Sequence, residues 1–112
     1  MTDEQRKYRR APMSGMVKFY QWNRPFQAAS AEISAEGMFL ATPATLAEGA
    51  MVTVRLAIPG LARAFTVLAK VVRPVRGNLL RPTGLGLQFV DIAAGDRRSI
   101  LEYVDRRGVG VT

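Results

Sequence analysis

A regular alternation of residue types is the feature of this sequence that most restricts its fold. From residue 52 to residue 58 every second residue is aliphatic, and the residues between are small, polar or charged. Side chains at every second position of a β-strand point to the same face, so this stretch predicts a strand with one buried face. Pro59–Gly60 then favours a turn, and residues 64–73 repeat the alternation. The two runs predict a long β-hairpin.

Four other stretches have the composition of strands, and the end of the chain has a different period. Residues 16–22, 26–33, 38–41 and 84–90 are rich in β-branched, aromatic and aliphatic residues. Apolar residues near the C-terminus recur with helical spacing and predict one helix over about 95–107. The pattern therefore predicts a mainly β fold: a small six-stranded antiparallel β-barrel, a split barrel, with a C-terminal α-helix. Its core should hold the large aromatic residues Phe19, Trp22, Phe39, Phe65 and Phe89.

With 112 residues the chain has room for one domain. Residues 1–12 are polar and basic and predict a flexible N-terminal arm, which leaves residues 13–112 for the barrel and its helix. We find no export signal and no apolar run of 18 residues. The expected location is the cytoplasm, without insertion into a membrane.

Two residue types are missing altogether, and their absence excludes most enzyme chemistry. The sequence contains no Cys and no His, so it lacks thiolate nucleophiles, imidazole bases and the usual ligands of zinc, haem and iron–sulfur clusters. Its serines lie in no nucleophile motif, and there is no phosphate-binding P-loop. We therefore expect a protein that is not an enzyme and has no catalytic residues, metal site or cofactor.

The charge points instead to an anionic ligand. The formal net charge is +7, and 13 of the 16 basic residues are Arg. The guanidinium group is a planar, permanently charged fork of donors that suits phosphate oxygens and the O6/N7 edge of guanine.

Two short motifs occur in order along the chain. The first is RxxxR, formed by Arg6 and Arg10 just before the first predicted strand, and the second is ExSxxG, formed by Glu32, Ser34 and Gly37 between two predicted strands. The pair resembles the RxxxR and (D/N)xSxxG signatures of the PilZ domain family. The sequences Gly37-Met38-Phe39-Leu40 and Gly84-Leu85-Gly86-Leu87-Gln88-Phe89-Val90-Asp91 are also similar to PilZ sequences, so the resemblance covers nearly the whole chain.

The resemblance implies a bacterial receptor for the second messenger cyclic di-GMP that binds its ligand without turnover. By this resemblance Arg6 and Arg10 would hold the phosphates and the guanine edges, with Arg9 as a supporting cation. The Ser34 hydroxyl would contact a ligand oxygen, and Gly37 would let the backbone approach. The protein would act in signal transduction through an unidentified protein effector, in control of motility, polysaccharide synthesis or secretion.

One position departs from the family pattern. Glu32 stands where the family has Asp or Asn, whose oxygen accepts hydrogen bonds from guanine. The extra methylene moves the acceptor by roughly 1.5 Å and adds rotamer entropy, so it should weaken binding.

Two other functions remain open at this stage. One is a PilZ-fold adaptor that does not bind cyclic di-GMP and acts through protein contacts. The other is a nonspecific nucleic-acid binder driven by charge, which should lose affinity steeply with salt. Because the basic residues concentrate in a short arm without an aromatic ladder, we expect no specific nucleic-acid binding.

Overall fold

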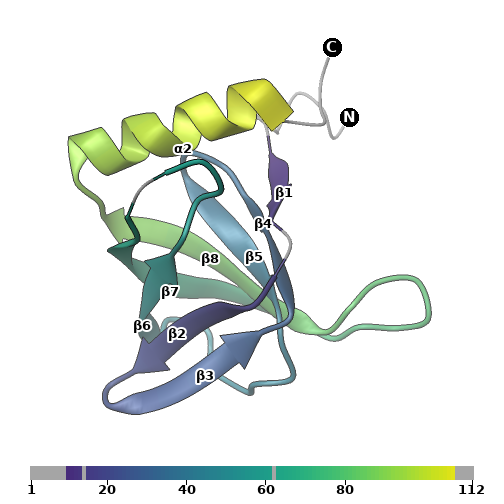
Figure 1. Ribbon diagram of the computed structural model, residues 1–112. Helices are drawn as coiled ribbons and strands as arrows, with labels where there is room; N and C mark the ends of the chain where they lie inside the picture. Colours follow the sequence, from purple (N-terminus) through teal and green to yellow (C-terminus); the bar gives the residue numbers. More distant parts are fainter. Residues whose placement is uncertain (1–9, 14, 62, 108–112) are drawn as a thin grey trace.

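The computed structural model describes residues 10–13, 15–61 and 63–107. This part of the chain forms one antiparallel sheet that curls into a half-barrel, with a helix across one end (Figure 1). Its elements are β1 (Ala11–Met13), β2 (Val17–Gln21), β3 (Arg24–Ala28), β4 (Ser30–Ile33), β5 (Gly37–Ala41), β6 (Met51–Leu56), β7 (Phe65–Val75), β8 (Gly84–Asp91) and α2 (Ala94–Arg107). The strands follow the order β1-β4-β5-β8-β7-β6-β2-β3. The predicted fold class and C-terminal helix are confirmed.

The sheet has eight strands in the described residues, whereas six were predicted. One extra strand arises because residues 26–33 do not form a single strand. The backbone N–H of Ala29 donates to the carbonyl of Ala41 at 2.9 Å, and the chain passes there from β3 to β4. The other is β1, which pairs with β4. Ala11 and Pro12 were assigned to the flexible arm, but they lie in this strand.

Trp22 was expected in the core, but it is 88% exposed. β2 ends at Gln21, which pairs with Arg24, so Trp22 and Asn23 form the two-residue turn between β2 and β3. Trp22 has φ 57°, in the left-handed region where such a tight hairpin turn places its residues. The predicted strand included Trp22, and its end one residue earlier moves the indole out of the core.

The core lies on the inner face of the curled sheet. The alternating residues of the predicted hairpin are buried there, with Val54 paired to Val67 in the β6–β7 register. α2 closes one end of the half-barrel with Ile100, Tyr103 and Val104, all less than 5% exposed. The core and α2 therefore leave the outer face of the sheet available for a binding site.

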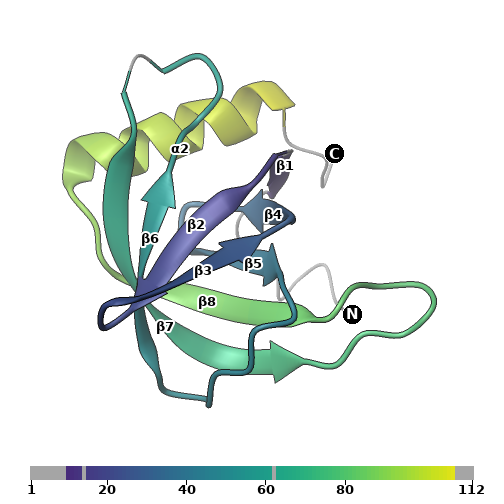
Figure 2. The same ribbon diagram turned by 60° about the horizontal axis from the view of Figure 1, so that its bottom comes forward.

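The connection between β7 and β8, residues 76–83, extends well beyond the sheet. Figure 2 shows this β7–β8 loop projecting from the body, past the ends of the strands that it joins. The loop begins after the longest strand of the sheet, β7 with 11 residues.

Candidate functional site

A cavity of about 1070 Å³ lies over five adjacent strands, β1, β4, β5, β8 and β7. One row of cross-strand partners forms its floor: Pro12, Glu32, Phe39, Gly86 and Arg73. The first four of these residues alternate along their strands with members of the core, so they lie on the outer face of the sheet.

Arg73 reaches this row because β7 is irregular. Val67, Ala69 and Val71 are buried, and strict alternation would place Arg73 on the same inner face. The register shifts between Val71 and Arg73, and Arg73 stands opposite Gly86. A β-bulge redirects the side chains that follow it. The cation thereby joins the floor of the cavity.

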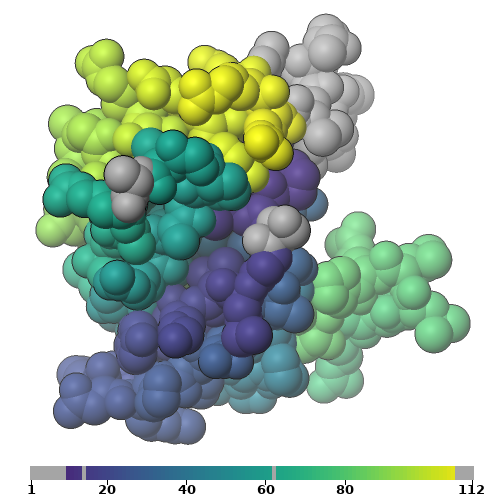
Figure 3. Space-filling model, viewed as in Figure 1, coloured from purple at the N-terminus to yellow at the C-terminus, as the bar shows by residue number. Residues whose placement is uncertain are grey.

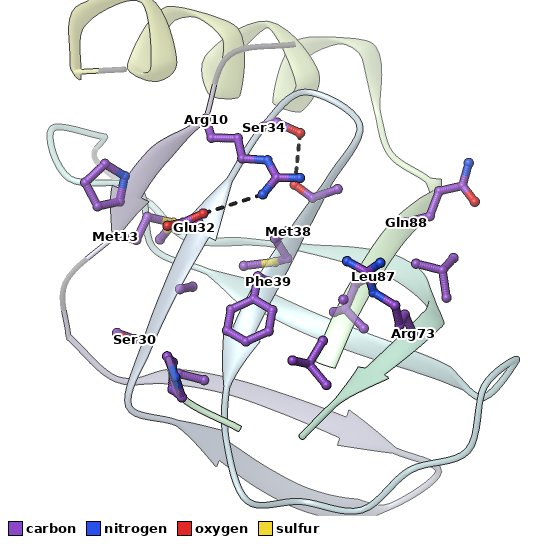
Figure 4. Close-up of a pocket in the computed structure, with 18 of the residues that line it drawn as sticks. Arg10, Met13, Ser30, Glu32, Ser34, Met38, Phe39, Arg73, Leu87 and Gln88 are labelled. Carbon is purple, nitrogen blue, oxygen red and sulfur yellow. Dashed lines mark hydrogen bonds and ion pairs between the residues drawn. The ribbon is translucent and has the colours of Figure 1, made fainter. Parts of the chain in front are cut away.

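The two sequence motifs meet at the β1 end of the cavity. β1 pairs with β4 so that Pro12 stands opposite Glu32, and this register brings Arg10 next to the second motif. Arg10 Nη1 lies 3.7 Å from Glu32 Oε1, and the side chains point toward each other in Figure 4. Both side chains are about half exposed (49% and 56%), so water screens the ion pair. The guanidinium keeps donors free for an incoming anion.

The β4–β5 turn, residues 34–36, is held by the Ser34 hydroxyl. The hydroxyl donates to the Gly37 carbonyl and accepts from the Glu36 backbone N–H, both at 3.3 Å. The Ser34 N–H also donates to the Gly37 carbonyl at 2.9 Å. Ser34 therefore organises the turn as well as lining the cavity.

Gly37 is required for packing within the sheet. Its backbone conformation is ordinary, since Gly37 is not among the glycines with positive φ. A Cβ at this position would instead overlap the carbonyl oxygen of Leu87 on β8. Gly37 thus permits close packing of β5 on β8, where it pairs with Gln88.

Two side chains of helix α2, Tyr103 and Arg97, bind the two motif segments. The hydroxyl of Tyr103 donates to the carbonyl of Pro12 at 2.7 Å and fastens β1 two residues after Arg10. Arg97 Nη2 donates to Glu36 Oε2 at 2.6 Å and fastens the β4–β5 turn. These two contacts fix the β1 side of the cavity relative to the turn.

Phe39 supplies a flat apolar surface in the middle of the cavity floor. Its ring occupies the space that a side chain at Gly84 would need. The residue is only partly buried and lines the cavity, as Figure 4 shows. An aromatic ring with one accessible face can stack against a planar base.

Charge is distributed unevenly around the cavity. Its two carboxylates, Glu32 and Glu36, are each paired with an arginine. At the far end, Arg73 and Arg81 line the cavity, and neither belongs to an ion pair of the described residues. The arrangement can accept an extended anion with planar groups, held between cations at both ends.

Four of the six predicted site residues, Arg10, Glu32, Ser34 and Gly37, lie together on this cavity. Arg6 and Arg9 lie outside the described residues. In the described part no group of three or more acidic side chains could hold a metal ion. Within the same residues no helix combines the length and apolar character needed to cross a membrane.

Sequence reasoning missed several residues of this site. Arg73 and Arg81 carried no motif, and Phe39 was assigned to the core. Tyr103 did carry a weak signal, since a tyrosine within an apolar helix stripe needs a partner for its hydroxyl once buried. No sequence signal links Arg97 to Glu36, which lie 61 residues apart.

Comparisons with known proteins agree with the fold and with the family resemblance. A model of the PilZ domain family matches residues 4–106. No curated protein matches the sequence. The solved structure of the Bacillus subtilis inhibitor of motility (MotI/DgrA) has a TM-score of 0.72 at 22% sequence identity; the match covers 90% of this chain and 50% of that one. At this identity the likeness shows a shared fold, and the present chain spans half the length of its neighbour.

Proposed function

The chain belongs to the PilZ domain family, and on this premise we propose that it is a receptor and adaptor that binds cyclic di-GMP without turning it over. The family is one of receptor and adaptor domains in second-messenger signalling. The observation that carries the proposal is the meeting of the two motifs: Arg10 and Glu32, distant in sequence, lie 3.7 Å apart at one end of a cavity that Ser34 and Gly37 also line.

Cyclic di-GMP offers two kinds of group that this cavity suits. Its phosphates are anions, and its guanines present paired acceptors at O6 and N7 along with N–H donors. The guanidinium of Arg10 can donate two parallel hydrogen bonds to the O6 and N7 atoms of a guanine. The carboxylate of Glu32 can accept from guanine N–H groups, and the accessible face of Phe39 can stack on a base. Arg6 and Arg9 would add cations from the segment that precedes β1.

Binding should replace the ion pair between Arg10 and Glu32. The pair is long, at 3.7 Å, and exposed, so breaking it costs little. Each partner would then contact a different part of the ligand. The affinity for cyclic di-GMP should still be lower than in a site with Asp at this position. The extra methylene of Glu32 displaces the acceptor oxygen, and the longer side chain loses more rotamer entropy on binding.

The output is proposed to pass through a protein partner. The described residues form one sheet and one helix, and we propose that another molecule recognises their liganded state. The structural neighbour is titled an inhibitor of motility. We place the present chain in the same broad class of outputs: motility, polysaccharide or secretion control.

Titration calorimetry with cyclic di-GMP tests the proposal. The wild-type chain should bind, and Arg10→Ala should lower affinity at least about tenfold, because it removes charge-assisted hydrogen bonds. Arg55→Ala is the matched control, since Arg55 is exposed on β6 and does not line the cavity. Absence of binding by the wild type, or equal binding by Arg10→Ala, would contradict the proposal.

The ion pair between Arg10 and Glu32 also favours a second candidate, an adaptor that binds no nucleotide. In that case the pair neutralises the site permanently and the domain acts by protein contact alone. Glu32→Asp distinguishes the two: binding that appears only in this variant would show that Glu32 silences the site. Tight binding by the wild type would rule the second candidate out.

A further inference from the structure

Two leucines at the tip of the β7–β8 loop are uncovered in the described structure. Leu79 is fully exposed and Leu80 is 94% exposed. The space-filling view shows the loop standing clear of the body (Figure 3). Isolated exposed leucines are common in folded proteins, but two adjacent ones at the end of a projection form a compact apolar tip.

The loop that carries this tip is internally organised. The side-chain oxygen of Asn78 accepts from the N–H groups of Leu80 and Arg81, at 2.8 and 3.1 Å. The N–H of Asn78 donates to the carbonyl of Arg81 at 2.9 Å, and the N–H of Gly77 donates to the hydroxyl of Thr83 at 3.0 Å. These bonds hold the backbone without help from the core. A partner that meets the tip thus meets a preformed shape and loses less entropy on ordering it.

The charge around the tip has one sign. Arg76 and Arg81 flank the leucines, and both are exposed. Between Glu48 and Asp91 the sequence carries six basic residues and no acidic one. The two ion pairs of the described residues use Arg10 and Arg97, not the arginines of the loop. The occupant of the tip must therefore offer an apolar layer bordered by negative charge.

We propose that the β7–β8 loop is a shallow anchor for anionic membrane surfaces. Leu79 and Leu80 enter the boundary of the acyl chains, while Arg76 and Arg81 contact lipid phosphates. A bilayer fits this tip better than a protein does, because a stable protein interface buries about 800 Å² on each partner and this tip has only two apolar side chains. No apolar run of 18 residues occurs in the sequence, and shallow contact needs none.

The proposal is independent of cyclic di-GMP. Leu79 and Leu80 do not line the cavity, so changing them should leave ligand binding intact. Arg81 does line it. For this reason Arg76, which lies outside the cavity lining, is the better position for testing the charge.

Co-sedimentation of the full chain with vesicles tests the anchor. We expect binding to vesicles of phosphatidylcholine with phosphatidylserine, and little to phosphatidylcholine alone. Leu79→Ser/Leu80→Ser should weaken binding at least tenfold, and Arg76→Gln should weaken it several-fold. Leu61→Ser is the matched control, because Leu61 is an exposed leucine in another loop of the same acid-free segment. No binding by the wild type, or equal losses in the double variant and the control, would overturn the proposal.

A fluorescence measurement tests the anchor independently if Leu79→Ser/Leu80→Ser folds poorly. In Trp22→Phe/Leu79→Trp the only indole sits at the tip, and its emission should shift to the blue on addition of the anionic vesicles. An unshifted spectrum would overturn the anchor. So would photo-crosslinking from position 79 in cells that yields one protein adduct and no lipid, because the tip would then fit a protein socket.

Discussion

The β4–β5 turn and the β7–β8 loop use the same local chemistry in opposite surroundings. In each, a side-chain oxygen near the start accepts from backbone N–H groups that follow it: the Ser34 hydroxyl in the first and the Asn78 amide oxygen in the second. The first segment is then fastened to its neighbours, since Glu36 is paired with Arg97 and the backbone of Phe89 donates to Glu36. The second extends away from the sheet (Figure 2).

This difference shows that a local hydrogen-bonded turn does not decide what a segment does. The β4–β5 turn is tied into the sheet and the helix, so it can hold ligand groups at fixed positions. The β7–β8 loop is joined to its neighbours at its base, where the Thr83 carbonyl accepts from the N–H of Thr42, and its tip is held by bonds within the loop. It can therefore carry an apolar tip to another surface. Changes in the first should affect the whole fold, whereas changes in the second should stay local.

The largest contrast is expected between two glycine substitutions. In Gly37→Ala the new Cβ overlaps the carbonyl of Leu87, so the β5–β8 pairing must shift, with a loss of about 3 kcal/mol in the free energy of unfolding. In Gly77→Ala the overlap is with Thr83 and Arg81 inside the loop, and the loss should stay below about 1 kcal/mol. Urea denaturation of both variants measures the difference. Equal losses would remove the distinction between the two segments.

A smaller contrast is expected when the two organising side chains are removed. Ser34→Ala deletes two partly buried hydrogen bonds and should lower the free energy of unfolding by about 1 kcal/mol. Asn78→Ala deletes exposed ones and should cost less than about 0.5 kcal/mol globally, because water replaces the lost acceptor. Hydrogen exchange should locate the second effect in residues 80 and 81. A global loss in Asn78→Ala as large as in Ser34→Ala would contradict this.

The smallest effect on stability is expected at the ion pair that fastens the turn. Both partners are partly exposed, at 39% and 44%, so Arg97→Gln should cost less than about 0.5 kcal/mol. Affinity for cyclic di-GMP should fall a few-fold, because the carboxylate of Glu36 then faces the anionic ligand without its partner. The loss should shrink at high salt.

A rescue experiment separates charge from structure in that prediction. Glu36→Gln removes the carboxylate, so adding it to Arg97→Gln should restore most of the affinity. Arg76→Gln is the control, because Arg76 lies outside the cavity lining. A double variant that binds as weakly as Arg97→Gln would mean that Arg97 acts by holding the turn and not by neutralising it.

Much of the fold was predictable because its signals are local. The alternation at residues 52–58 and 64–73 predicted the β6–β7 hairpin, and helical spacing predicted α2 to within one residue. The predictions were wrong where a single residue decided where a strand ends. Ending β2 at Gln21 exposed Trp22, and the break at Ala29 divided one predicted strand into two.

The candidate site was predictable in part for the same reason. Both motifs are short and continuous in the sequence, so Arg10, Glu32, Ser34 and Gly37 could be proposed from their resemblance to the family signatures. The contacts that hold them were not, because they join distant segments. Tyr103 and Pro12 are 91 residues apart. A bulge in β7 turns Arg73 toward the cavity. The alternation of residue types that precedes the bulge does not predict it.

The sequence by itself determined most of the strands, the place of the helix, and the two motifs that resemble the signatures of the family. These properties depend on the period of the side chains and on residue type, which are local. Only the tertiary structure decided that Arg10 faces Glu32, that Arg73 lies on the outer face, and that Leu79 and Leu80 are exposed among the described residues. Register, bulges and the packing of the helix set those outcomes, because they depend on how distant segments fit together.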